Sequence, residues 1–165
     1  MDEADGSVVS NSGPLIGLAA VSRLHLLKDL YGFALIPDAV YEEVAGAGHD
    51  RPGAAELEEA KWLQRVAVNP PPDRLLLEEL GRGEAEAITL AVHLKARLLV
   101  LDDRKARRIA EIAYGIRVKG VAGILVSAKR KGLLSEVIPV LDAMRTAGYY
   151  LSERVLSAVR QEAGE

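Results

Sequence analysis

Short apolar runs alternate with amphipathic stretches along most of this 165-residue chain. The clearest run, Leu98 to Leu101, is continuously apolar, as expected for a strand covered on both faces. Shorter runs of the same kind lie at residues 8–9, 34–36, 66–68 and 116–118. Because helical patterns separate these strands, the sequence predicts an α/β fold with three layers, α/β/α, around a mainly parallel central sheet.

Helix-start signals follow several of the strands. Ser12 is expected to cap a short helix with Pro14 in its first turn, and Ser22 to cap a second helix from residue 23 to residue 30. Ser135 and Ser152 are expected to begin the last two helices. Further helices are expected over residues 39–45, 54–63, 84–96, 104–113 and 120–131.

The composition indicates one folded domain spanning residues 1–165, with an acidic tail at 1–7 and C-terminal helices at about 135–163. Hydrophobic residues make up 49% of the chain, which is too high a share for a disordered protein. The net charge, 21 − 24 = −3, argues against a uniformly basic DNA-binding surface, although it leaves room for a local basic patch.

The chain has no cysteine, which excludes disulfides, cysteine zinc sites and thiol nucleophiles and fits a reducing cytoplasm. No run approaches the roughly 18 apolar residues of a membrane helix. The start of the chain is acidic where a signal peptide would be basic. We therefore expect a cytoplasmic protein without a membrane partner.

Polar side chains gather where the predicted strands end. In parallel α/β sheets the ligand site lies at the carboxyl ends of the strands, so these side chains are the first candidates for chemistry. Two acidic pairs on helices are expected to join them at the same edge. The strand-end group comprises Asn11, Ser12, Asp38, Asp102 and Asp103, and the helical pairs are Glu42 with Glu43 and Glu84 with Glu86.

Each acidic residue also has a structural explanation. Glu84 suits the positive end of a helix dipole, Glu42 and Glu43 suit a solvated helix face, and Asp102 suits a helix cap. Together, however, carboxylates at one edge repel unless protons or a cation neutralise them. Mg²⁺ or Mn²⁺ is the natural partner, because a chain without cysteine or clustered histidine offers mainly oxygen ligands. Such a site can polarise a phosphodiester and activate water.

Other catalytic designs fit less well. Gly115 to Gly120 has the glycine spacing of a phosphate-binding P-loop, but Val121 follows where lysine is required. Gly46 to Gly48 follows a helix, which argues against a dinucleotide fingerprint, and Ser12 does not lie in a nucleophile elbow. A phospho-acceptor receiver domain also pairs aspartates with a late lysine, here Lys119, but its acidic pair belongs to the first strand.

Basic residues follow the acidic strand end. Arg104, Lys105, Arg107 and Arg108 come directly after the aspartates, and residues 129–131 form a second basic run. The helix dipole accounts for the second run. The first run suggests contacts to the phosphates of a nucleic acid beside the acidic centre.

Five segments spanning about residues 8–160 together resemble the PIN-domain nucleases, in particular a prokaryotic subgroup of PIN-like proteins. The segments, in order, are VVSNSGPLIGLA, IPDAVYEEV, GRGEAEAITLA, LLVLDDRKARRIA and GILVSAKRKGLL. The resemblance implies helices around a parallel sheet, an acidic rim that binds Mg²⁺ or Mn²⁺, and hydrolysis of single-stranded RNA. Many such proteins are toxins of toxin–antitoxin pairs and form homodimers, so an antitoxin protein and a second copy of the chain are the implied partners.

Carried over by position, the resemblance implies metal ligation and catalysis by Asn11, Glu43, Glu84 and Asp102. Glu42 replaces Glu43 if the register shifts, Glu86 competes with Glu84, and Asp103 is a second ligand or a water-orienting group. The implied substrate contacts are Ser12, Arg104, Lys105 and Arg108.

The main departure from the family pattern is Asn11, which stands where the family has an aspartate. An amide oxygen can bind Mg²⁺, but it brings no charge and cannot act as a base. A catalytically weak or inactive PIN-like module that binds RNA or a protein is therefore the alternative function.

Overall fold

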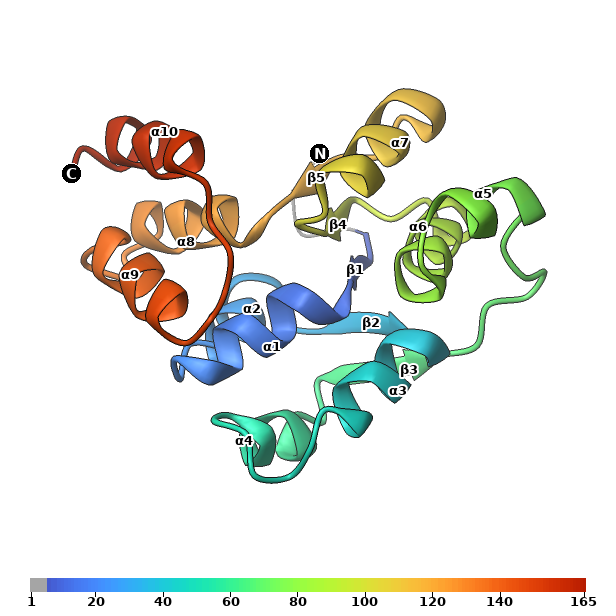
Figure 1. The fold of residues 1–165 in the computed structure, drawn as a ribbon, viewed down its shortest axis with the longest axis horizontal. Helices are drawn as coiled ribbons and strands as arrows, with labels where there is room; N and C mark the ends of the chain where they lie inside the picture. The colour runs from blue at the N-terminus through green and yellow to red at the C-terminus, as the bar shows by residue number, and fades with distance from the viewer. Residues whose placement is uncertain (1–5) are drawn as a thin grey trace.

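A parallel sheet organises the part of the chain described by this computed structural model, residues 6–165 (Figure 1). Of the expected acidic tail, residues 1–5 lie outside the described part. The sheet has five strands there, in the order β3-β2-β1-β4-β5, and every pairing is parallel. The strands are β1 (Val8–Ser10), β2 (Ala34–Pro37), β3 (Leu63–Val66), β4 (Leu98–Val100) and β5 (Val118–Lys119). The expected parallel α/β fold is confirmed.

Helices connect the strands and cover both faces of the sheet (Figure 1). Those in the first half of the chain are α1 (Ser12–Ala20), α2 (His25–Tyr31), α3 (Asp38–Gly46), α4 (Ala54–Glu59) and α5 (Arg74–Glu79). Those in the second half are α6 (Arg82–Leu94), α7 (Arg104–Tyr114), α8 (Val121–Arg130), α9 (Ile138–Thr146) and α10 (Glu153–Ala163). Among the described residues, no helix is long and apolar enough to cross a membrane.

The alternation of side chains along the strands divides the interior into two cores. Val8 and Val100 point to the core shared with α1, α2, α8, α9 and α10. Val9, Leu99 and Leu101 point to the core shared with α5, α6 and α7. Since successive strand residues face opposite sides, a run such as 98–101 must be apolar throughout to fill both cores.

Several expected boundaries were wrong. The third strand is β3 at 63–66 and not 66–68, because this edge strand exposes Gln64 and Arg65 and so lacks a continuous apolar run. The second helix begins at His25 rather than after a Ser22 cap, since Ser22 has a positive φ of 57°. The helix expected from Ser135 begins at residue 138.

Helix caps were predicted correctly at one of these serines only. Ser152 caps α10, and its side chain accepts a hydrogen bond from the Val155 amide at 3.2 Å. Ser12 does not cap α1, because the N-cap position is Asn11 and Ser12 already belongs to the helix. The Ser12 hydroxyl is therefore available for another partner.

The register places the polar strand ends at one edge of the sheet. Ser10 pairs with Val100, and the Asn11 amide donates to the Val100 carbonyl at 2.9 Å. Asn11 and Asp102 thus follow neighbouring strands at the same edge. Asp38 follows β2, the neighbour of β1 on the other side.

Candidate functional site

Asn11 is buried where β1 passes into α1. The residue is only 6% exposed, and its side-chain oxygen Oδ1 has no hydrogen-bond partner within residues 6–165. A buried acceptor without a partner costs about 1–3 kcal/mol in desolvation and requires an explanation. Asn11 Oδ1 can therefore accept a donor or bind a cation from outside the described residues.

Glu43 reaches the same region from α3. The Ser12 hydroxyl donates a hydrogen bond to Glu43 Oε2 and ties α3 to the start of α1. Gly83 in α6 leaves room for this carboxylate, since a Cβ there would overlap the Glu43 oxygens. Thus the structure brings Glu43 into contact with Ser12, the residue that follows Asn11.

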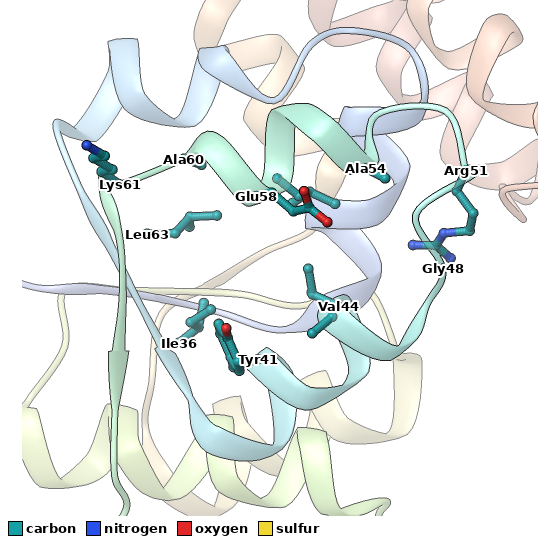
Figure 2. Close-up of a pocket in the computed structure, with 12 residues that line it drawn as sticks. Ile36, Tyr41, Val44, Gly48, Arg51, Ala54, Glu58, Ala60, Lys61 and Leu63 are labelled. Atoms are coloured by element: carbon teal, nitrogen blue, oxygen red, sulfur yellow. The ribbon is translucent and has the colours of Figure 1, made fainter.

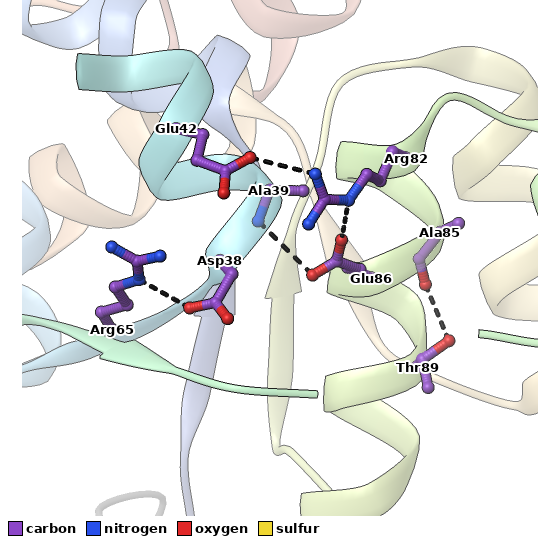
Figure 3. A network of polar contacts seen from close by, with 8 residues as sticks. All are labelled: Asp38, Ala39, Glu42, Arg65, Arg82, Ala85, Glu86 and Thr89. Atoms are coloured by element: carbon purple, nitrogen blue, oxygen red, sulfur yellow. Dashed lines mark hydrogen bonds and ion pairs between the residues drawn. The ribbon is translucent and has the colours of Figure 1, made fainter. Parts of the chain in front are cut away.

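Glu42 and Glu86 belong to a separate ion-pair network between α3 and α6 (Figure 3). Arg82 donates to Glu86 Oε2 at 2.7 Å and to Glu42 Oε2 at 3.0 Å. Glu86 Oε1 also accepts from the Ala39 amide at 3.4 Å, so it stands at the start of α3. Nearby, Arg65 pairs with Asp38 at 2.6 Å. These carboxylates already have cationic partners.

Glu84 lies in the first turn of α6 and turns back over the start of its own helix. A Cβ at Gly81 would lie 2.8 Å from Glu84 Oε2. In the part of the chain that the structure describes, the Glu84 carboxylate makes no hydrogen bond or ion pair. Of Glu84 and Glu86, Glu84 is the one whose carboxylate has no cationic partner among the described residues.

Asp102 follows β4 and is held by three groups of the chain. Its carboxylate accepts from the Val121 amide at 3.1 and 3.2 Å, which places it at the start of α8, and from the Tyr149 hydroxyl. The Arg107 guanidinium lies beside it near Gly120. Burial raises the pKa of Asp102 above its ordinary value, while the Tyr149 and Val121 hydrogen bonds and the Arg107 charge oppose that rise.

Asp103 takes the capping role that had been considered for Asp102. Its Oδ1 accepts from the Ala106 amide at 2.8 Å, and Asp103 is the N-cap of α7. Its placement as a second ligand or a water-orienting group stays a prediction.

The basic residues near the aspartates differ in their surroundings. Arg104 and Arg108 are exposed on α7, whereas Lys105 is paired with Glu79 at 2.8 Å. Exposed ion pairs contribute about 0–1 kcal/mol, so a phosphate could displace Glu79. Arg107 was not among the expected substrate contacts, and its position beside Asp102 distinguishes it from its neighbours.

The side chains of this edge suit a hard cation by their chemistry. Asn11 Oδ1, Glu43, Glu84 and Asp102 offer only oxygen, the donor that Mg²⁺ and Mn²⁺ prefer, and Asn11 Oδ1 is buried without a partner. Within residues 6–165, however, no three acidic or histidine side chains stand close enough to form a metal cluster. Glu43 accepts a hydrogen bond from the Ser12 hydroxyl, and Asp102 accepts one from the Tyr149 hydroxyl.

A cavity of about 310 Å³ lies apart from this edge, between α3, α4 and the strands β2 and β3 (Figure 2). Ile36, Val44 and Leu63 give it an apolar lining, and Arg51 and Lys61 lie at its margin. None of the strand-edge candidates lines it. Its α3 residues occupy the face of that helix opposite to Glu43, so the cavity and the acidic edge are separate features.

The family of this chain follows from a comparison with known protein families. A family model described as a PIN domain matches residues 7–165. The chain belongs to the PIN domain family. This confirms the predicted family and places the PIN domain in a superfamily of nucleases. No curated protein matches the chain.

The PIN domain also contains contacts that sequence reasoning missed. Tyr149 and the Val121 amide, which hold Asp102, are 47 and 19 residues away from it in the chain. Nothing in the local pattern distinguishes Tyr149 from Tyr150, and a backbone amide carries no sequence signal. Arg107 lies within the basic run noted in the sequence, but only the fold shows that its guanidinium lies near Gly120, beside Asp102.

Proposed function

We propose that this PIN domain is a metal-dependent endoribonuclease that hydrolyses phosphodiester bonds of single-stranded RNA. The observation that carries the proposal is the buried, unpartnered Oδ1 of Asn11 at the edge where β1 and β4 end. Family membership supports the nuclease class. Asn11, Glu43, Glu84 and Asp102 would hold Mg²⁺ or Mn²⁺ there.

The chain's own groups divide the remaining tasks. A bound divalent cation would supply polarisation of the scissile phosphate and acidification of a water molecule. Asn11 contributes an oxygen but neither charge nor basicity, so the carboxylates must take up the proton of the attacking water. Glu84 makes no hydrogen bond or ion pair within residues 6–165 and is therefore the proposed acceptor. Asp103 keeps Oδ2 to orient water, since its Oδ1 caps α7.

The proposed phosphate-binding residues lie in the first half of α7. Arg104 and Arg108 are exposed, and Lys105 is held only by a surface ion pair. The positive end of the α7 dipole adds to their attraction for an anion. Ser12 orients Glu43 and would contact the RNA only if it released that carboxylate.

The test is cleavage of single-stranded RNA with Mn²⁺ by wild type, Asp102→Asn, Glu84→Gln and Glu43→Gln. Glu42→Gln is the matched control, because Glu42 is adjacent in sequence but pairs with Arg82 at the surface. We expect the first three variants to lose activity and the control to retain it. Equal activity in all five proteins would refute the assignment.

Asn11 favours a second candidate, a PIN-like module that binds RNA or a protein without turnover. A neutral first ligand weakens the hold on a cation and removes a base. Binding of Mn²⁺ and RNA without cleavage of any single-stranded substrate would favour this module over the nuclease.

The proposed nuclease also fits the toxin of a toxin–antitoxin pair acting as a homodimer in the cytoplasm. The support is the resemblance to toxin ribonucleases. Expression of wild type should then arrest growth while Asp102→Asn should not. One chain has a mass of 17.7 kDa, and light scattering should give twice that mass. Unimpaired growth with active enzyme would separate the toxin role from the nuclease activity.

A further inference from the structure

A glycine on α1, Gly17, leaves a slot for the aromatic ring of Tyr149. Gly13 and Gly17 are four residues apart and so lie on the same helix face. A Cβ at Gly17 would lie 2.7 Å from ring carbons of Tyr149 and from the Met144 methyl, a distance that real Cβ atoms do not show. A Cβ at Gly13 would lie 3.8 Å from the Tyr149 hydroxyl, which is ordinary contact. The ring position therefore depends on Gly17 and not on Gly13.

Tyr149 enters this slot from the segment between α9 and α10. Its amide donates to the Met144 carbonyl at 2.9 Å and anchors the backbone to the end of α9. Its ring is partly buried, whereas the neighbouring Tyr150 is 86% exposed. Two adjacent tyrosines thus have opposite surroundings, and only the first is built into the fold.

The slot directs the Tyr149 hydroxyl to the end of β4, where it donates to Asp102 Oδ2. The Val121 amide contacts both oxygens of the same carboxylate, so two donors on separate elements fix its orientation. A carboxylate offers about four lone-pair sites, so these contacts leave a site for a cation.

We propose that Tyr149 is a positioning residue that holds the Asp102 carboxylate in the orientation needed to bind a divalent cation. The proposal rests on the function proposed above, in which Asp102 is a ligand. It makes the cation affinity depend on how the α9–α10 segment docks on α1. Partners of metal ligands commonly contribute 10- to 100-fold to affinity, because they orient the ligand.

The experiment measures Mn²⁺ affinity by calorimetry, together with thermal unfolding of the metal-free proteins. Tyr149→Phe keeps the ring in the slot and removes only the hydroxyl, and Tyr150→Phe is its matched control. Gly17→Ala keeps the hydroxyl but displaces the ring, and Gly13→Ala is the control on the same helix face. Asp102→Asn reports whether Asp102 binds the cation at all.

We expect Tyr149→Phe and Gly17→Ala to weaken Mn²⁺ binding by about tenfold or more, and both controls to bind like wild type. The thermal unfolding measurement checks that Tyr149→Phe is folded at the temperature of the binding assay. If Tyr149→Phe binds Mn²⁺ as tightly as wild type while Asp102→Asn binds weakly, the positioning role is refuted and the proposed metal site stands. If wild type and Asp102→Asn bind alike, or wild type does not bind, the metal site itself is refuted and the positioning role with it.

Discussion

Glu84 and Glu86 stand two residues apart in α6, and the structure predicts that their substitution has opposite consequences. Glu86 is 6% exposed and bridges Arg82 and the first turn of α3, whereas Glu84 has no partner among the described residues. We expect Glu86→Gln to lower stability and Glu84→Gln to lower metal binding and RNA cleavage. The pair thus separates a structural carboxylate from a functional one.

The magnitude follows from the contacts of Glu86. A hydrogen bond to a charged group contributes about 1.5–3 kcal/mol. The lower end applies, because glutamine retains an acceptor and because Arg82, with a 61% exposed side chain, stays solvated and keeps Glu42 at 3.0 Å. The expected loss is about 1.5 kcal/mol, which corresponds to about 3–6 °C in the melting temperature of a domain of this size. Glu84→Gln should change stability by less than about 0.5 kcal/mol.

Urea unfolding at pH 7 without metal gives both stabilities, and Mn²⁺ titration of the same samples gives both affinities. A Glu86→Gln variant as stable as wild type would refute the structural role of the network in Figure 3. A Glu84→Gln variant that loses stability but binds Mn²⁺ normally would reverse the assignment of the two glutamates.

Three further sets of substitutions test residue 11 and two carboxylates, those of Asp103 and Glu165. Asn11→Asp places an unpaired charge in a buried position, so it should lower the stability of the metal-free protein by more than about 1 kcal/mol. The added charge should also tighten Mn²⁺ binding. If calorimetry shows unchanged Mn²⁺ binding, residue 11 is not part of the metal site. Asp103→Ala should cost about 1 kcal/mol in urea unfolding through the lost α7 cap, and Asp103→Asn should retain most of that stability. Burial favours a raised pKa at Glu165, but hydrogen bonds from the Val137 and Ile138 amides and from Lys129 outweigh it and lower the pKa to about 2. Its stabilisation should therefore be complete above pH 4.5 and vanish as the pH falls towards 2, so the stability difference between wild type and Glu165→Gln must shrink over that interval.

The sheet could be predicted from the sequence because buried parallel strands leave a strong local signal. The run at 98–101 is apolar throughout, since its residues fill both cores. The edge strand β3 gives a weaker signal, because Gln64 and Arg65 meet solvent, and its predicted position was shifted accordingly. The strand order puts the two ends bearing Asn11 and Asp102 side by side, and the principle that ligands bind at strand ends found both residues.

The roles within each acidic pair could not be predicted, because distant partners decide them. Glu42 and Glu43 are equivalent in a local pattern, but one meets Arg82 of α6 and the other meets Ser12 of α1. Tyr149 reaches Asp102 across 47 residues, through a slot at Gly17, a glycine that carries no signal of its own.

Six of the helices in the described part of the chain begin in one of two ways, and the difference explains which caps the sequence predicts. α5, α7 and α10 receive a hydrogen bond from the side chain of their own N-cap residue, which a local pattern can show. α3, α8 and α9 have no such cap and receive a distant carboxylate instead, respectively from Glu86, Asp102 and Glu165.

Part of the excess of acidic residues is therefore structural, because some carboxylates accept hydrogen bonds from the first amides of distant helices. From the net charge alone, these carboxylates could not be told apart from those of a metal site. Of the residues that form these long-range caps, Asp102 is also a proposed metal ligand, since it caps α8 and follows β4 at the candidate site. A cation bound there would have to share that carboxylate with the Val121 amide and the Tyr149 hydroxyl. The affinity for the cation should then be coupled, through the Asp102 side chain, to the packing of helices α8, α9 and α10 on the sheet.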